Sequence, residues 1–290
     1  MYKGLVLSGG GIKGIYQLGV MHAYQDHGTF DSTQLTHISG TSIGSLIGFL
    51  IALGISPRRM YTYFKQTKLS MAINTNTFNR LFHKMGMYDI DRFMEHVCAL
   101  LVEHEIDPMI TFNDVYRLYK IRLYIPVTNL DQVYHVVYSA ETTPDMQCID
   151  AIGKSCNIPG IFTHNRDADS QTIVDGGLVD NIPWYYLSHL VDPILSIMVQ
   201  DVHDTGDDTE DKVDSASVYI GKVIAAITRP SREYTLFSQR SNVSAVTVYN
   251  HGYTISNGLL PDSIDAMYEI GYQVGRSYAC AQRFEFDETM

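Results

Sequence analysis

The sequence predicts an α/β fold with a mainly parallel central sheet and helices on both faces. Two short apolar segments, residues 5–7 and 35–39, each run into a glycine-rich turn and then into a segment with helical periodicity. This repeated order of strand, turn and helix is typical of parallel sheets, because parallel neighbours need a crossover connection. The balance of 45% hydrophobic and 18% charged residues is that of a folded globular chain.

The remaining elements follow in order along the chain. Residues 57–120 are expected to be mostly helical, most clearly at 92–103, and a long helix is expected at 263–280. This last helix carries an apolar stripe formed by Ile264, Met267, Gly271, Val274 and Tyr278. The further expected strands are residues 121–128, 133–138, 173–174 and 193–199. No repeat or break in composition divides the chain, so residues 1–290 are predicted to form a single domain.

Charge and segment lengths restrict the classes of function. The net charge is −11, and residues 201–214 carry seven acidic side chains against one lysine. Because nucleic acid phosphates require a cationic surface, nucleic acid is not expected as a partner. The first residues are not expected to form a signal peptide, and no run reaches the ~18 apolar residues of a membrane-spanning helix. We therefore expect a cytoplasmic protein, with peripheral membrane contact left open. The four cysteines lack metal-site spacing, and no metal is expected.

Residues 40–44, Gly-Thr-Ser-Ile-Gly, match the Gly-x-Ser-x-Gly pattern of a nucleophile elbow. In such a turn the side chains two residues to either side of the serine would collide with backbone, and here Gly40 and Gly44 occupy those places. The turn would present the Ser42 hydroxyl at a helix N-terminus, where the helix dipole favours a developing anion. We interpret Ser42 as a nucleophile, with an ordinary glycine-rich turn as the alternative.

A second glycine motif, residues 9–14, opens the first expected helix and allows three interpretations. It consists of Gly9, Gly10, Gly11, Ile12, Lys13 and Gly14. A P-loop is excluded because no serine or threonine follows Lys13. The dinucleotide fingerprint Gly-x-Gly-x-x-Gly fits the spacing, but it needs an acidic residue at the end of the second strand, where Ser42 stands instead. An oxyanion hole of backbone amides facing Ser42 explains both glycine motifs together.

A serine nucleophile needs a base, and Asp175 follows the short strand expected at 173–174. Alone, Asp175, Gly176 and Gly177 read as a β-turn. The order of the glycine loop, the Gly-x-Ser-x-Gly turn and this Asp-Gly-Gly, however, resembles the patatin-like phospholipase family. The resemblance extends to residues 151–162, similar to the family's Ala-Ser-x-Ala-x-Pro-x-x-Phe segment, and to 175–183, where Asp-Gly-Gly precedes Asn-x-Pro. Cys156 and Asn157 depart from the small residues of that pattern.

The resemblance implies a three-layer, modified α/β-hydrolase-like fold and a Ser-Asp dyad without a catalytic histidine. Ser42 would be the nucleophile, Asp175 the base, and the amides of Gly10 and Gly11 the oxyanion donors. The implied substrates are phospholipid, lysophospholipid or another acyl ester, and no cofactor is required. Because an Asp with an ordinary pKa near 3.9 is a poor base for a hydroxyl, the site must desolvate Asp175. Lys13 would hold a phosphate or the loop, with a solvated surface lysine as the alternative.

Other interpretations stay open at this point. The chain could bind a nucleotide through residues 9–14, or bind lipid without turning it over. His251 could complete a triad, whereas His189 would end a helix expected at 183–190 and His203 lies in the acidic segment. Residues 76–88 mix aromatic, apolar and basic side chains, which suits either a lid in transient contact with a membrane surface or a connection folded back on the core.

Overall fold

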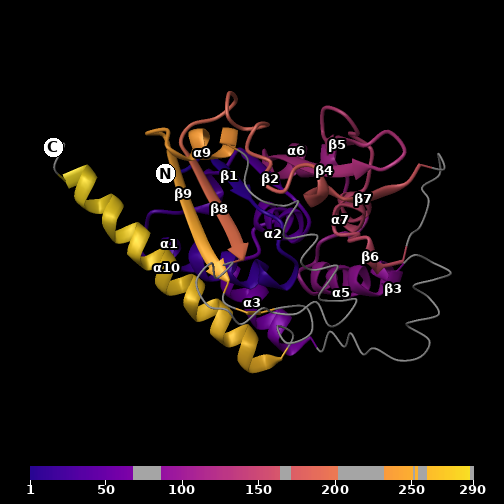
Figure 1. Ribbon diagram of the computed structural model, residues 1–290, viewed down its shortest axis with the longest axis horizontal. Helices are drawn as coiled ribbons and strands as arrows, with labels where there is room; N and C mark the ends of the chain where they lie inside the picture. Colours follow the sequence, from indigo (N-terminus) through magenta and orange to yellow (C-terminus); the bar gives the residue numbers. More distant parts are fainter. Residues whose placement is uncertain (68–85, 164–170, 202–231, 251, 254–259, 288–290) are drawn as a thin grey trace, which may run out of the picture.

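The computed structural model describes residues 1–67, 86–163, 171–201, 232–250, 252–253 and 260–287 (Figure 1). Its main sheet has the order β5–β4–β2–β1–β8–β9, with β7 also paired to β4. The strands are β1 (Gly4–Leu7), β2 (His37–Gly40), β4 (Arg122–Asn129), β5 (Tyr134–Ser139), β7 (Ile173–Asp175), β8 (Ile194–Asp201) and β9 (Val243–Asn250). All pairs are parallel except β4–β5 and β4–β7, so the prediction of a mainly parallel sheet is confirmed.

Helices of varied length connect and cover these strands. The α-helices are α1 (Gly14–Asp26), α2 (Ile43–Ala52), α3 (Pro57–Gln66), α5 (Ile90–Glu103), α6 (Phe112–Tyr119), α7 (Cys148–Ser155), α9 (Arg232–Ser238) and α10 (Pro261–Asp287). Short 3-10 turns form η1 (Gly11–Lys13), η2 (Ser32–Gln34) and η3 (Gly176–Leu178). A separate parallel pair, β3 (Gly86–Tyr88) and β6 (Gly160–Phe162), was not expected from the sequence.

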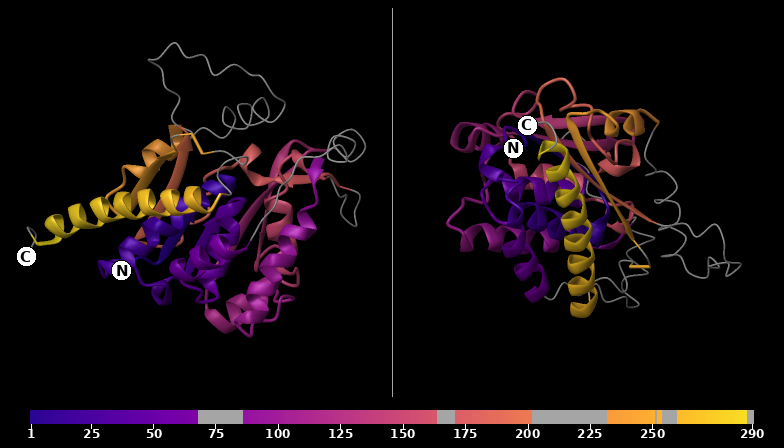
Figure 2. Two further views of the ribbon diagram at one scale, coloured as in Figure 1. Left: turned by 90° about the horizontal axis from the view of Figure 1, so that it is seen from below. Right: turned by 90° about the vertical axis from the view of Figure 1, so that its left-hand side faces the viewer.

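Alternate side chains of β1 separate the two faces of the sheet. Leu5 and Leu7 point into the larger core, which α1, α2 and α10 share, and α10 lies along α1 (Figure 2). Val6 points into the smaller core on the opposite face, together with Leu187 and Phe237 of α9. Successive residues of a strand face opposite sides, so one helix layer lies on each side of the sheet and the second layer is thinner.

Part of that second layer corrects an expectation. Residues 183–190 form a series of turns rather than a helix, and the amides of Leu187 and Ser188 both donate to the Trp184 carbonyl. The segment is too short for a helix to form on propensity alone, so packing decides its path. The Trp184 ring stacks on Phe237 of α9 with 4.9 Å between ring centroids.

The stripe expected on the last helix is mostly confirmed. Ile264 and Met267 are buried, and Gly271 lies against the backbone of α1. Tyr278, in contrast, is 41% exposed, and the buried line continues through Ala279 instead. An α-helix has 3.6 residues per turn, so spacings of three and four residues only approximate one face. Over the four turns from Ile264 this error adds up to one residue, and Ala279 is buried in place of Tyr278.

Candidate functional site

The turn at Ser42 has the form of a nucleophile elbow. β2 ends at Gly40 and α2 begins at Ile43, with Ser42 between them at φ 53° and ψ −125°. A non-glycine residue with positive φ is strained and is held there only by its surroundings. A Cβ on Gly40 would lie 2.3 Å from the Gly44 carbonyl oxygen, and one on Gly44 would lie 2.6 Å from the Leu7 carbonyl oxygen. Both positions therefore require glycine for steric reasons.

Strand pairing brings Asp175 to this turn. β5 occupies one edge of β4, so β2 and β7 must share the other edge. β2 runs parallel to β4 and pairs as far as Tyr124, whereas β7 runs in the opposite direction and reaches Val127 with Asp175. The carboxyl ends of the two strands therefore point toward each other across a gap at Pro126. Ser42 lies two residues beyond the end of β2, and Asp175 is the last residue of β7.

The side chains of Ser42 and Asp175 meet directly. The Ser42 hydroxyl donates to Asp175 Oδ2 at 2.6 Å, and the Gly177 amide donates to Asp175 Oδ1 at 2.7 Å. Both side chains are buried, with Ser42 4% and Asp175 6% exposed. Because the hydrogen bond is direct, no imidazole separates the two groups. Gly176 permits the turn after Asp175, since a Cβ there would lie 2.3 Å from the Pro126 carbonyl oxygen.

Burial changes the proton affinity of Asp175. Desolvation raises the pKa of its carboxyl from 3.8 to about 6, although the hydrogen bonds from Ser42 and Gly177 act in the opposite direction. The carboxylate is therefore still ionised at pH 7, yet it binds a proton far more readily than an exposed aspartate. From the sequence we expect that Asp175 must be desolvated to act as a base, and the carboxyl is desolvated here.

The glycine loop lies beside Ser42. A Cβ on Gly9 would lie 3.5 Å from the Ser42 Cβ and 2.4 Å from Asn181 Oδ1, so a side chain there would displace the Asn181 amide. Gly14, the first residue of α1, is packed equally closely on Ile43. No described residue accepts a hydrogen bond from the amides of Gly10 or Gly11. Two backbone donors are thus left unpaired by the described part of the chain, in the loop that faces the hydroxyl.

Ser155, at the end of α7, is a site residue to which the sequence assigned no role. Its Oγ accepts from the Ser42 amide at 3.0 Å and donates to the Pro126 carbonyl at 2.8 Å. Ser155 is fully buried and so ties the strained elbow to the gap in β4. The segment 151–162 pointed to this region of the chain, but spacing alone could not show which side chain would contact the elbow.

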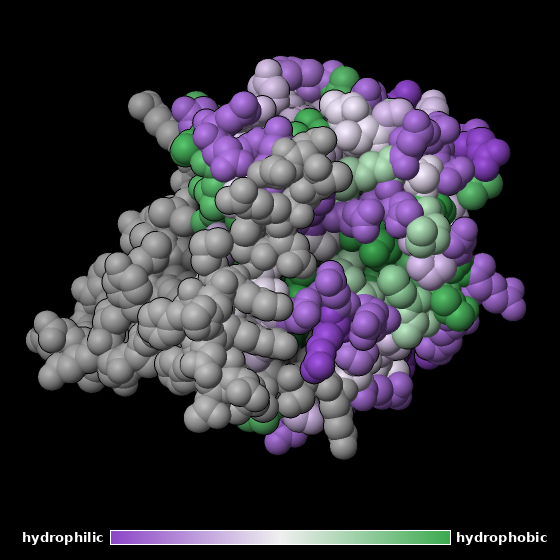
Figure 3. Space-filling view, turned by 90° about the vertical axis from the view of Figure 1, so that its right-hand side faces the viewer, coloured by the Kyte–Doolittle hydropathy of each residue, from purple (hydrophilic) through white to green (hydrophobic). Residues whose placement is uncertain are grey.

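An apolar pocket opens at Ser42, with a volume of about 760 Å³ that includes its open side. Its walls come from α1, α2, α3, α5 and the chain around β6. The side chains that form them include Ile15, Leu18, Ile43, Ile47, Phe64, Phe93, Ile158, Ile161 and Phe162. On the face carrying β3, β6 and α5, Figure 3 shows hydrophobic residues gathered between hydrophilic borders. The pocket suits a hydrocarbon chain that ends near the hydroxyl.

The other candidate residues have different outcomes. Lys13 is not a solvated surface side chain, because its ammonium pairs with Asp201 at 2.7 Å and its side chain is 20% exposed. His189 is exposed beside Tyr185. His203, His251 and residues 76–85 lie outside the described residues, and 86–88 form β3. None of the helices in the described ranges combines the length and apolar character needed to cross a membrane.

Comparison with known proteins identifies relatives. The family model described as patatin-like phospholipase matches residues 5–188. A probable lipid hydrolase, 463L, of Invertebrate iridescent virus 6 is 26% identical over 187 residues, which span 63% of this chain and 62% of that protein. A cGAMP-activated phospholipase of Escherichia coli strain TW11681 is 27% identical over 200 residues, 62% of this chain and 53% of that protein. The chain thus matches less than two thirds of the length of either relative.

The fold is similar to that of a solved structure. VipD from Legionella pneumophila superposes with a TM-score of 0.56 at 17% identity, covering 97% of this chain and 67% of that one. At that identity the likeness concerns the fold alone. The family match spans the glycine loop, the elbow, the Ser155 segment and Asp175 in one continuous stretch. The chain therefore belongs to the patatin-like phospholipase family.

Proposed function

We propose that the chain is a lipid acyl hydrolase of the phospholipase A or lysophospholipase type. The observation that carries this proposal is the 2.6 Å hydrogen bond from the Ser42 hydroxyl to buried Asp175, at the wall of an apolar pocket. The relatives named as a lipid hydrolase and a phospholipase support the same reaction class. The substrates would be phospholipid, lysophospholipid or another acyl ester, reached through transient contact with a membrane surface.

The first half-reaction acylates Ser42. As the Ser42 oxygen attacks the ester carbonyl, its proton passes to Asp175 Oδ2 along the existing hydrogen bond. Negative charge then develops on the former carbonyl oxygen. The unpaired amides of Gly10 and Gly11 and the N-terminus of α2 would stabilise that charge. Asp175 returns the proton to the departing alcohol, which is a lysophospholipid when the substrate is a phospholipid and a glycerophosphodiester when it is a lysophospholipid.

The second half-reaction repeats these roles with water. Asp175 accepts a proton from a water molecule, which attacks the Ser42 ester and passes through a second oxyanion. Collapse of this intermediate returns the proton to the Ser42 oxygen and releases the fatty acid. The pocket contributes by burying the acyl chain, at about 0.8 kcal/mol for each methylene removed from water.

A fluorophosphonate probe tests this proposal. The wild type should be labelled, and Ser42→Ala should not be, because the probe reacts with an activated serine. Asp175→Asn should remain folded but lose esterase turnover. Equal labelling of wild type and Ser42→Ala, or labelling of neither, would refute the enzyme proposal, and the second result would favour binding without catalysis. Normal turnover by Asp175→Asn together with an inactive His251→Ala would replace the dyad by a triad.

A further inference from the structure

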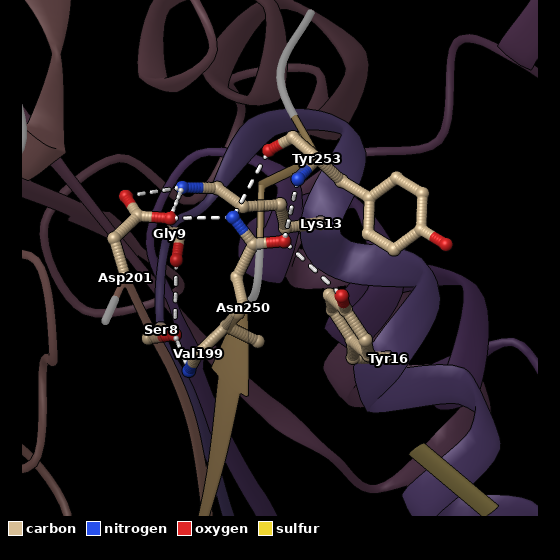
Figure 4. Close-up of polar contacts among 8 residues, drawn as sticks. All are labelled: Ser8, Gly9, Lys13, Tyr16, Val199, Asp201, Asn250 and Tyr253. Carbon is tan, nitrogen blue, oxygen red and sulfur yellow. Dashed lines mark hydrogen bonds and ion pairs between the residues drawn. The ribbon is translucent and has the colours of Figure 1, made fainter. Parts of the chain in front are cut away.

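An ion pair outside the reacting groups holds the glycine loop. Lys13 closes the loop, and its ammonium lies 2.9 Å from Asp201 Oδ1 and 2.7 Å from Oδ2 (Figure 4). Asp201 is the last residue of β8, and neither it nor its neighbour Asn250 falls within the 5–188 family match. We propose that Asp201, supported by Asn250, is a positioning residue that fixes the oxyanion loop against β8.

The end of β8 extends beyond its neighbour β1 and lies beside the glycine loop. β1 pairs with β8 only as far as Leu7 and Ile197, so the last four residues of β8 extend beyond β1. The glycine loop runs beside this extension and is attached to it twice. The Val199 amide donates to Ser8 Oγ at 3.0 Å at the start of the loop, and Lys13 pairs with Asp201 at its end. Gly10 and Gly11 lie between the two attachments.

Asp201 is itself held by a partly buried network of hydrogen bonds from β9. Asn250, which pairs with Asp201 across the two strands, donates from Nδ2 to Asp201 Oδ1 at 2.7 Å. Asn250 Oδ1 accepts from the Tyr16 hydroxyl at 3.1 Å, and Asn250 Nδ2 also donates to the Tyr253 carbonyl at 3.0 Å. Asn250 is 5% exposed, and Tyr16 is fully buried. The carboxylate therefore has little freedom to follow Lys13 if the loop shifts.

Movement at Lys13 would reach Gly10 directly. The Lys13 amide donates to the Gly10 carbonyl at 3.2 Å, and a Cβ on Gly10 would lie 3.7 Å from Lys13 Cβ and 3.9 Å from Val199 Cβ. Gly10 thus lies beside the same two residues that the attachments hold. Because an oxyanion hole acts through donors that are already in place, a small displacement of this loop lowers the rate more than the binding of substrate.

The ion pair with Asp201 also indicates that Lys13 holds the glycine loop rather than a substrate phosphate. A lysine that bound a substrate phosphate would need a free ammonium, whereas here a carboxylate holds two of its hydrogen bonds. The inference rests on the proposed function, since it concerns the oxyanion loop of that same site. It predicts that loss of the pair lowers kcat equally for substrates with and without a phosphate.

Kinetics of Asp201→Asn and Lys13→Met on two esters with the same acyl chain test the inference. One ester is a p-nitrophenyl ester and the other a lysophosphatidylcholine. Each variant should lower kcat roughly ten- to a hundredfold on both substrates, with KM changed less than about twofold. The double variant should be no slower than the slower single variant, because both changes break one pair. Glu141→Gln is the matched control, since it breaks the Arg122–Glu141 pair of 2.7 Å at the opposite end of the sheet and should leave both constants unchanged.

Two results would overturn the inference. A wild-type kcat for Asp201→Asn, in a preparation whose Ser42→Ala variant is inactive, would remove the positioning role and leave the proposed function intact. A rise in KM confined to the lysophospholipid in Lys13→Met would show that Lys13 binds phosphate instead. Activity that persists in Ser42→Ala would refute the proposed function itself, which is a separate outcome. Thermal unfolding of each variant confirms that the kinetics are measured on folded protein.

Discussion

Replacing Asp175 by asparagine should abolish turnover and at the same time make the protein more stable at neutral pH. The carboxyl is buried, and desolvation raises its pKa from 3.8 to about 6. Its ionised form is therefore less favourable in the folded chain than in the unfolded one. Asparagine has nearly the same shape without the charge, and its side-chain oxygen can still accept from the Gly177 amide.

The magnitude follows from proton linkage. A group whose pKa is raised by folding stabilises the folded state below its unfolded pKa, and that contribution is lost as the pH rises through the folded pKa. For Asp175 the loss falls between pH 3.8 and about 6. A rise of about two pKa units, at roughly 1.4 kcal/mol each, corresponds to about 3 kcal/mol. Roughly half of this amount is already lost at pH 5.

Urea unfolding at pH 8 and pH 5 measures the effect. Asp175→Asn should exceed the wild type by about 3 kcal/mol in free energy of unfolding at pH 8, and by about half as much at pH 5. Asp145→Asn is a matched control, because Asp145 is exposed and its replacement should change the stability by less than about 0.5 kcal/mol. A variant no more stable than the wild type at pH 8 would refute the argument from burial. If the stability advantage of Asp175→Asn over the wild type grew as the pH fell, folding would lower the pKa of Asp175 rather than raise it, and the argument would be wrong.

Three further predictions concern the same site. The value of kcat/KM should rise as the pH passes through about 6 and then level off, because Asp175, as the proposed base, would accept the Ser42 proton only when ionised; a flat profile from pH 5 to 8 would contradict this. Ser155→Ala should lower the free energy of unfolding by about 1–3 kcal/mol in the same urea assay, since the Ser42 amide and the Pro126 carbonyl lose a buried partner; an unchanged value would exclude that role. Gly40→Ala should yield little folded protein by gel filtration, because its Cβ would lie 2.3 Å from a carbonyl oxygen, and a wild-type elution profile and melting temperature would show that the turn tolerates a side chain.

The sequence predicted those parts of the site whose requirements are local. The elbow needs a strand, a serine with its two flanking glycines, and a helix within a few consecutive residues. Each of these can be recognised from the local pattern of residue types. The strained φ of 53° at Ser42 and the close contacts at Gly40 and Gly44 are consequences of that same short segment. Steric demands over five residues can be deduced without knowledge of the rest of the fold.

Elements that depend on distant partners were missed or misplaced. β3 and β6 are each three residues long and lie far apart in the sequence, with Gly86 opposite Gly160. No local pattern indicates that two such short segments will pair. Residues 183–190 carry an apolar pattern close to that of a helix, yet stacking on α9 determines their path. The pairing of Lys13 with Asp201 spans 188 positions in the same way. In each case tertiary contacts override local preference.

Asp175 shows where local deduction stops and what takes its place. Its own segment reads as a turn, and nothing within it places a carboxylate 2.6 Å from a hydroxyl 133 positions earlier. That distance results from β4, because β2 and β7 pair with the same edge of this strand from opposite directions and end on either side of Pro126. The Pro126 carbonyl then accepts from Ser155, which in turn accepts from the Ser42 amide, so the elbow is attached to the strand that positions Asp175. Ser42 and Asp175 are thus both positioned by one strand in the interior of the sheet, and displacing one relative to the other would require breaking strand pairing rather than moving a loop.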